Sequence, residues 1–84
     1  MALPIPKVIL YTRAGCCLCE EAKQVLAAAS GRAAFEIEEI DIDRHPRWLA
    51  LYHEEVPVIA IDGRKAFKHR VGVDEFLKRL AARA

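Results

Sequence analysis

The chain has 84 residues, of which 54% are hydrophobic and 30% charged, so we expect one small globular domain over residues 1–84. Its 13 basic and 12 acidic residues leave a formal net charge of +1, which gives no overall case for binding nucleic acid or a membrane surface. No stretch reaches the roughly 18 apolar residues of a membrane span and the first residues lack a secretory-signal pattern, so we expect a cytoplasmic protein.

The first half of the chain predicts a strand followed by a helix. The apolar run over residues 7–11 is typical of a central strand, and residues 12–15 form a short loop. The next segment, 17–29, predicts a helix, and Gly31 is expected to end it in a left-handed conformation. The apolar stripe of this helix consists of Leu18, Ala22, Val25, Leu26 and Ala29.

A second strand and a short second helix are predicted next. Residues 34–42 alternate well enough between apolar and polar side chains for a strand. Asp43 is expected to cap a helix over 44–53, in whose first turn Pro46 is tolerable. The apolar side of that helix consists of Trp48, Leu51 and Tyr52.

The last part of the chain predicts a hairpin and a third helix. Residues 57–61 form a third strand, and Asp62–Gly63 is a strong two-residue turn signal. Residues 64–67 return as a fourth strand, expected at an edge of the sheet, and a helix near Asp74 covers 73–83. The apolar face of this helix consists of Val73, Phe76, Leu77, Leu80 and Ala81.

The predicted order is therefore β-α-β-α-β-β-α, an α/β fold with a four-stranded mixed sheet flanked by three helices. A right-handed crossover makes the first two strands parallel. The hairpin makes the last two strands antiparallel. The basic segment 64–70 is interpreted either as a charge-protected edge or as a docking patch for anions.

Three cysteines, Cys16, Cys17 and Cys19, stand at the start of the first predicted helix. Side chains three residues apart share one helix face, so Cys16 and Cys19 can form a disulfide if the geometry allows it. Cys16 lies where unpaired N–H groups and the helix dipole favour an anion, here the reactive thiolate. In a reducing cytosol such a cluster favours catalysis or metal binding over a structural disulfide.

Charged neighbours act on this thiolate in opposite directions. Arg13 either supports it through its charge or is an ordinary solvated cation. Glu20 and Glu21 suit the first turn of a helix but place negative charge nearby. The neighbouring Cys17 is interpreted as a spectator or as a second thiol that competes for Cys19 or a metal.

The C-x-x-C after the first strand, the Tyr11–Cys16 segment that precedes it, and Val56–Pro57 at the third strand together resemble glutaredoxin-like proteins of the thioredoxin superfamily. The resemblance runs from Val8 to Leu80 and implies a thioredoxin-like fold with a cis Val56–Pro57 peptide bond. The departures from the family pattern are Gly15, Cys17, Leu18, Glu55 and the single Gly72 in place of Gly-Gly.

The leading hypothesis is a small thiol–disulfide oxidoreductase that works as a monomer. Cys16 attacks a disulfide in a protein or small molecule, and Cys19 resolves the mixed disulfide. The predicted substrate-binding residues are Tyr11, Arg13, Val56 and Pro57, although Tyr11 is expected to face the core. No tightly bound cofactor is expected, and glutathione is the candidate reductant implied by the resemblance.

Two alternatives stay open at this point. One is a non-catalytic adaptor that binds partners through a groove at Pro57. The other is a metal or iron–sulfur module that uses Cys16, Cys17 and Cys19, for which a fourth ligand is missing because no histidine has a zinc-like spacing to them.

Overall fold

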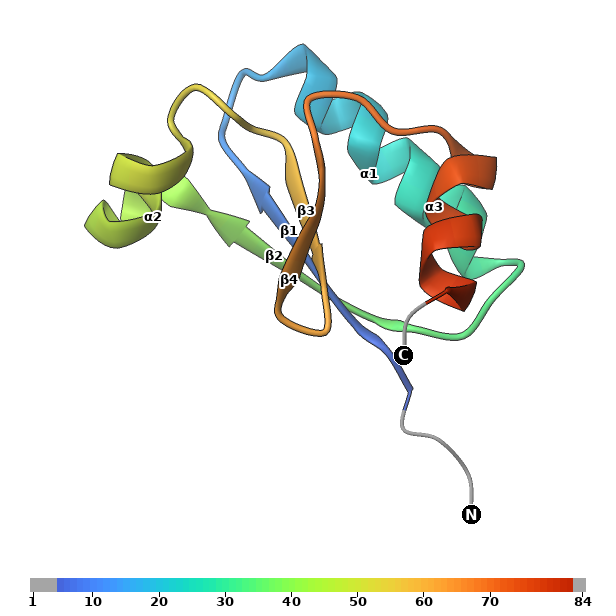
Figure 1. Ribbon diagram of the computed structural model, residues 1–84. Coiled ribbons are helices and arrows are strands. Elements are labelled where there is room, and N and C mark those ends of the chain that lie inside the picture. The colour runs from blue at the N-terminus through green and yellow to red at the C-terminus, as the bar shows by residue number, and fades with distance from the viewer. Residues whose placement is uncertain (1–4, 83–84) are drawn as a thin grey trace.

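The computed structural model describes residues 5–82, and the predicted order of strands and helices is confirmed there, with one short 3₁₀ helix added (Figure 1). The elements are β1 (Lys7–Thr12), α1 (Cys17–Ser30), β2 (Glu36–Asp41), η1 (Ile42–Arg44), α2 (Pro46–Tyr52), β3 (Val58–Ile61), β4 (Arg64–Lys68) and α3 (Val73–Ala81).

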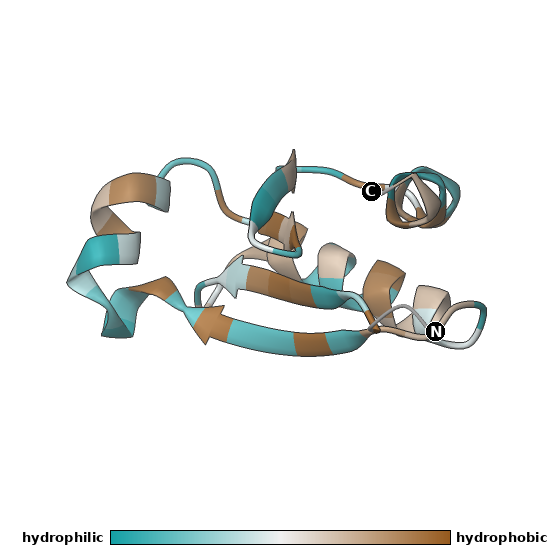
Figure 2. Ribbon diagram, turned by 60° about the horizontal axis from the view of Figure 1, so that its bottom comes forward, coloured by the Kyte–Doolittle hydropathy of each residue, from teal (hydrophilic) through white to brown (hydrophobic). Residues whose placement is uncertain are grey.

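The four strands form one mixed sheet in the order β2-β1-β3-β4. β1 is parallel to β2 and antiparallel to β3, and β3 is antiparallel to β4. The predicted edge position of β4 is confirmed. β2, the opposite edge, carries Glu36, Glu38 and Glu39 and is mostly hydrophilic in Figure 2. β4 carries Arg64, Lys65 and Lys68, so one edge of the sheet is acidic and the other is basic.

The main core lies on the face of the sheet that α1 and α3 cover. Alternate residues of β1 point to opposite faces, and Val8 and Leu10 point to this one. Phe76 from α3 is fully buried against them, and its ring meets Phe35 edge-on at 5.3 Å between centroids. The buried members of this cluster are Val8, Leu10, Ala22, Leu26, Ala29, Ile59, Ile61, Phe76 and Leu80.

A second, smaller core lies on the other face of the sheet, under α2. Its fully buried members are Ile42 and Val58, and Tyr11 is 6% exposed. α2 itself has no buried residue and is held by Trp48 and Tyr52, whose rings lie 5.0 and 4.9 Å from the ring of Tyr11. The aromatic side chains therefore hold this helix to the sheet.

The start of α2 differs from the prediction. The expected helix over 44–53 with Asp43 as its cap is replaced by η1 and then by α2, which begins at Pro46. Asp41 caps η1, because its Oδ1 accepts a hydrogen bond from the N–H of Asp43 at 3.0 Å, whereas the N-cap of α2 is His45, which makes no side-chain capping bond. The residue before a proline is driven out of helical conformation, and His45 is accordingly extended, with φ −135°.

Other expectations were wrong in detail. Gly31 has φ −77°, so α1 ends in right-handed conformation, and the N–H groups of residues 31–33 close the last turn on Ala28 and Ala29. Leu51 is 55% exposed, and Leu49 packs in its place against the second core. α3 ends at Ala81; residue 83 of the predicted helix lies outside the described residues.

The predicted strand bounds change by a residue or two. β2 spans Glu36–Asp41 rather than 34–42, because Phe35 turns into the main core and Ile42 begins η1. β3 begins at Val58, after Pro57.

Candidate functional site

The turn between β1 and α1 places the cysteines. Gly15 has φ +76°, a left-handed conformation that other residues rarely adopt, and it turns the chain into the helix. Cys16 is the N-cap of α1, and its Sγ accepts a hydrogen bond from the backbone N–H of Cys19 at 3.2 Å. A sulfur at this position faces unpaired backbone donors and the positive end of the helix dipole, both of which favour a thiolate.

The three thiols are free and differ in exposure. Cys17 is exposed, Cys16 is half-buried, and Cys19 is completely buried. Cys16 and Cys19 are brought together at the first turn of α1, whereas Cys17 points to solvent. Reagents and substrates therefore reach Cys16 without reaching Cys19.

The thiol of Cys19 ionises less readily than an exposed thiol because its pKa is raised. Burial raises its pKa, because a thiolate there would lose its hydration, and the neighbouring Cys16 sulfur adds to the rise. The hydroxyl of Thr12 and the backbone N–H of Arg13 act on the same thiol and lower its pKa. The burial effect is the largest of these.

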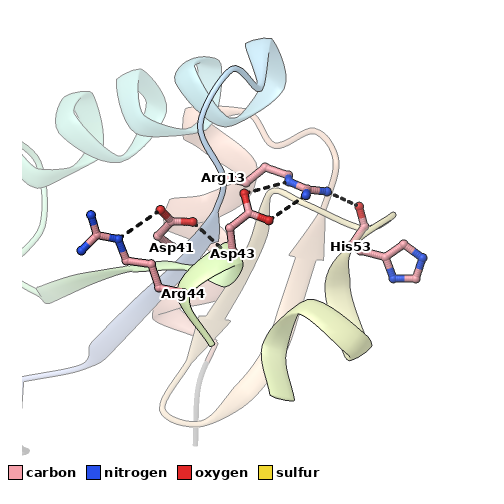
Figure 3. Close-up of polar contacts among 5 residues, drawn as sticks. All are labelled: Arg13, Asp41, Asp43, Arg44 and His53. Atoms are coloured by element: carbon pink, nitrogen blue, oxygen red, sulfur yellow. Dashed lines mark hydrogen bonds and ion pairs between the residues drawn. The ribbon is translucent and has the colours of Figure 1, made fainter. Parts of the chain in front are cut away.

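Arg13 is engaged away from the cysteines. Its Nη2 lies 2.7 Å from Oδ1 of Asp43, its Nε lies 3.3 Å from Oδ2, and its Nη1 donates to the carbonyl oxygen of His53 at 3.3 Å. Figure 3 shows the guanidinium directed toward both partners. Arg13 therefore joins the cysteine loop to η1 and to the end of α2, and the carboxylate of Asp43 neutralises its charge.

The Val56–Pro57 peptide bond is cis, as the resemblance implies. The sheet register pairs Tyr11 with Val58, so Pro57 lies across from Thr12, beside the strand end that leads to Cys16. The backbone N–H of Val56 already donates to the carbonyl oxygen of Tyr52 at 3.2 Å. The N–H of Val56 is therefore already engaged within the chain.

Tyr11 belongs to the second core rather than to the cysteine site. Its ring packs against Trp48 and Tyr52, and burial raises the pKa of its phenol. This placement agrees with the expectation that it faces the core. Of the four predicted substrate-binding residues, the structure brings Val56 and Pro57 to the strand end that leads to the cysteines.

A cavity of about 350 Å³ lies beside the cysteine turn on the side of α3. It is lined by Leu18, Glu21, Ala22, His69, Arg70, Val71, Gly72 and Glu75. Leu18, Gly72 and the basic segment 64–70 are separate features of the sequence, and no sequence pattern predicts that they share a cavity. The loop between β4 and α3 lies against the start of α1 and brings these residues together (Figure 1).

Residues 5–82 contain neither a grouped set of metal ligands nor a membrane-spanning helix. Within residues 5–82, no three side chains of histidine, cysteine, aspartate or glutamate are grouped so that they could hold a metal ion. No helix in that range is both long and apolar enough to cross a membrane.

Comparisons with known proteins agree with this geometry. The family model described as Glutaredoxin-like domain (DUF836) matches residues 7–81. A glutaredoxin-like protein of Dictyostelium discoideum is 38% identical over 71 residues, a match that covers 77% of this chain and 66% of that protein. The chain spans about two thirds of the length of the curated relatives that it matches.

Solved structures share the fold. The solution structure of a Nitrosomonas europaea protein superposes with a TM-score of 0.79 at 27% identity, covering 94% of this chain and 95% of that one. Glutaredoxin 1 of Francisella tularensis, crystallised with cacodylate, gives a TM-score of 0.50 at 28% identity, covering 90% of this chain and 92% of that one.

Proposed function

This chain belongs to the glutaredoxin-like domain (DUF836) family, and we propose that it is a small dithiol thiol–disulfide oxidoreductase. The observation that carries the proposal is the hydrogen bond of 3.2 Å from the N–H of Cys19 to Sγ of Cys16. It places an accessible sulfur at a helix N-terminus, with a second, buried sulfur one turn away.

In the first step, the Cys16 thiolate attacks one sulfur of a substrate disulfide. A Cys16–substrate disulfide forms, and the other substrate sulfur leaves as a thiolate. Cys16 suits this step because it is only half-buried, so part of it remains open to a substrate. The N–H of Cys19 also supports the negative charge on its sulfur.

In the second step, Cys19 attacks Sγ of Cys16. The Cys16–Cys19 disulfide forms, the substrate sulfur departs, and the proton of Cys19 ends on that sulfur. The substrate thereby gains two electrons and the protein loses two. Burial of Cys19 keeps its thiol away from bulk reagents until a mixed disulfide brings an electrophilic sulfur beside it.

We propose that the disulfide is reduced again by a small thiol such as glutathione, without a tightly bound cofactor, and that one chain suffices. The cavity is lined by Leu18, two residues after Cys16 in the sequence, and is the candidate place for part of a substrate or reductant. Its lining mixes the carboxylates of Glu21 and Glu75 with the guanidinium of Arg70, which suits a molecule that carries both charges.

The test equilibrates the purified protein in mixtures of reduced and oxidised glutathione, quenches with acid, and measures the intact mass. We expect a species lighter by two hydrogens, which is a protein with one internal disulfide, and digestion should assign that disulfide to Cys16–Cys19. Its dependence on the glutathione ratio then gives the reduction potential. Cys17→Ser is the matched control, since it removes a thiol and leaves the proposed pair.

The other outcomes separate the alternatives. A species heavier by one glutathione in the intact protein indicates a monothiol reaction and overturns the dithiol proposal. Three free thiols at every ratio overturn catalysis and favour the adaptor hypothesis. Iron or zinc in protein purified without oxygen favours the metal hypothesis.

A further inference from the structure

The outer side of β2 is an edge of the sheet with which no strand of the described chain pairs. β2 follows β1 in one unbroken register, and its first four residues are exposed. The opposite edge is protected, because a register shift at Ile59 and Ala60 gives the β3–β4 pair a bulge and because β4 carries lysines. β2 has neither a bulge nor a lysine, so it is the edge that can accept another strand.

The outward backbone groups of β2 belong to alternate residues. The N–H of Glu36 donates inward, to the carbonyl oxygen of Pro6 at 2.9 Å. Backbone groups of successive residues in a strand point to opposite sides, so the N–H and C=O groups of Ile37 and Glu39 point away from β1. An extended segment laid along β2 meets these groups at the spacing of a sheet ladder.

A second cavity, of about 230 Å³, lies beside this edge on the side of α1. Its apolar lining includes Leu26 and Ala27 of α1, together with Phe35 and Ile37. The side chain of Ile37 is 50% exposed although it is apolar. Side chains directly opposite each other on neighbouring strands share a face, so an apolar residue across from Ile37 covers it and lies over this cavity.

The other face of the same edge is acidic. Glu36 and Glu38 lie on this face, since they are two residues apart in a strand. The Nζ of Lys7 lies 3.2 Å from Oε1 of Glu38, and both side chains are about half exposed. Glu36 has no ion pair within residues 5–82. One lysine therefore serves two carboxylates, and a cation on a neighbouring strand meets negative charge that the fold leaves uncompensated.

We propose that β2 is a docking edge for an extended segment of a partner protein in which apolar and basic side chains alternate. The backbone of that segment pairs with Ile37 and Glu39, its apolar side chains cover Ile37 and the cavity, and its basic side chains meet Glu36 and Glu38. This site uses no cysteine and goes beyond the proposed redox function. Pairing of β2 with the β2 of a second copy is disfavoured, because it sets carboxylates against carboxylates.

The first experiment uses a short blocked peptide of alternating lysine and valine. It is added to the reduced protein while NMR follows the backbone amides. We expect shifted signals and slower hydrogen exchange at Ile37 and Glu39, whose N–H groups point outward. A matched peptide of alternating glutamate and valine should bind about tenfold more weakly, because it sets like charges against Glu36 and Glu38.

The second experiment changes the edge itself. Glu36→Lys, Glu38→Lys should reverse the preference, so that the glutamate peptide binds more tightly than the lysine peptide. Glu54→Lys, Asp74→Lys is the matched control, because it changes the net charge equally at side chains that are 85% and 93% exposed and lie outside β2. It should keep the preference of the parent.

A third variant tests the apolar contact. Ile37→Thr keeps a branched side chain suited to a strand and removes apolar surface. It should weaken the lysine peptide about fourfold, because a buried group about the size of a methylene is lost. The amide spectrum of each variant shows whether it is folded, and the comparison of the two peptides on the parent protein needs no variant.

The outcomes decide the proposal without reference to turnover. Equal binding of the two peptides by the parent overturns it, as do shifts confined to β4 or to the cysteine turn. Signals of Ile37 and Glu39 that move with protein concentration in the absence of peptide show that a second copy occupies the edge, and they overturn it too. Cys16→Ser should bind the lysine peptide like the parent, so failure of the oxidoreductase proposal in the redox-buffer experiment leaves this result in place.

Discussion

The guanidinium of Arg13 and the carboxylate of Asp43 form a two-point pair, with 2.7 Å from Nη2 to Oδ1 and 3.3 Å from Nε to Oδ2. The two side chains are 36% and 41% exposed, and they join parts of the chain that lie thirty residues apart in sequence. The pair therefore fixes the loop that leads to Cys16 against η1.

Asp43→Asn should lower the free energy of unfolding by about 0.5–1 kcal/mol, because a bidentate pair is lost but water already screens part of it. Urea denaturation measures the change. Asp74→Asn is the matched control, because Asp74 is 93% exposed and meets Arg32 through one contact of 3.4 Å. Equal effects of the two variants would contradict a structural role of the Arg13–Asp43 pair.

Cys17→Ser should leave disulfide turnover largely unchanged, within about twofold of the parent. Cys17 is exposed and points away from the pair formed by Cys16 and Cys19. The effect is measured as the rate at which each protein reduces a small disulfide with glutathione as reductant, and Cys16→Ser is the inactive reference. Near-complete loss of turnover in Cys17→Ser would contradict the interpretation that Cys17 is a spectator.

Cys19 should make the stability of the reduced protein fall at alkaline pH. Burial raises its pKa in the folded state, so above the ordinary thiol value of about 8.5 the unfolded chain ionises first. The contribution of Cys19 is thus fully present below that value and is lost as pH rises through its folded pKa. Urea denaturation at a series of pH values measures the decline.

Cys19→Ala is the control for this pH dependence. Tyr11 also has a pKa raised by burial, so it adds its own decline at higher pH in both proteins. The difference between the two curves isolates Cys19. Parallel curves across this range would show that the Cys19 thiol ionises equally easily in the folded and unfolded chain.

Tyr52→Ala should destabilise the protein by about 2 kcal/mol, because its ring packs against those of both Tyr11 and Trp48. Trp48 is the chain's single tryptophan, so its fluorescence reports on α2 directly. We expect the emission to shift toward that of solvated tryptophan before the main core unfolds. Leu51→Ala is the matched control, since Leu51 lies on the same helix and is 55% exposed.

The sequence predicts most of the sheet and the main core because these depend on local apolar patterns. The strand over 7–11 and the stripe from Ala22 to Ala29 are both found where the periodicity predicts them. The start of α2 could not be predicted in this way. Asp43 is a good capping residue in isolation, but Pro46 forces His45 into extended conformation and Arg13 holds the Asp43 carboxylate from a distant loop.

In the candidate site, too, local motifs predict some features and tertiary contacts decide the others. The C-x-x-C spacing and the cis bond before Pro57 follow from motifs, and the structure confirms the cis bond. The pairing of the Arg13 guanidinium with Asp43 depends on a tertiary contact that no spacing encodes. The cavity that we propose for a substrate or reductant could not be predicted either, because its lining comes from α1, the loop between β4 and α3, and α3.

The main core joins the first strand of the described chain to its last helix, because Phe76 and Leu80 pack in one cluster with Val8 and Leu10. During synthesis on the ribosome, β1 emerges before α3, so the apolar side chains of Val8 and Leu10 lack their complete cover until α3 has followed. The main core can therefore close only when residue 80 has left the exit tunnel.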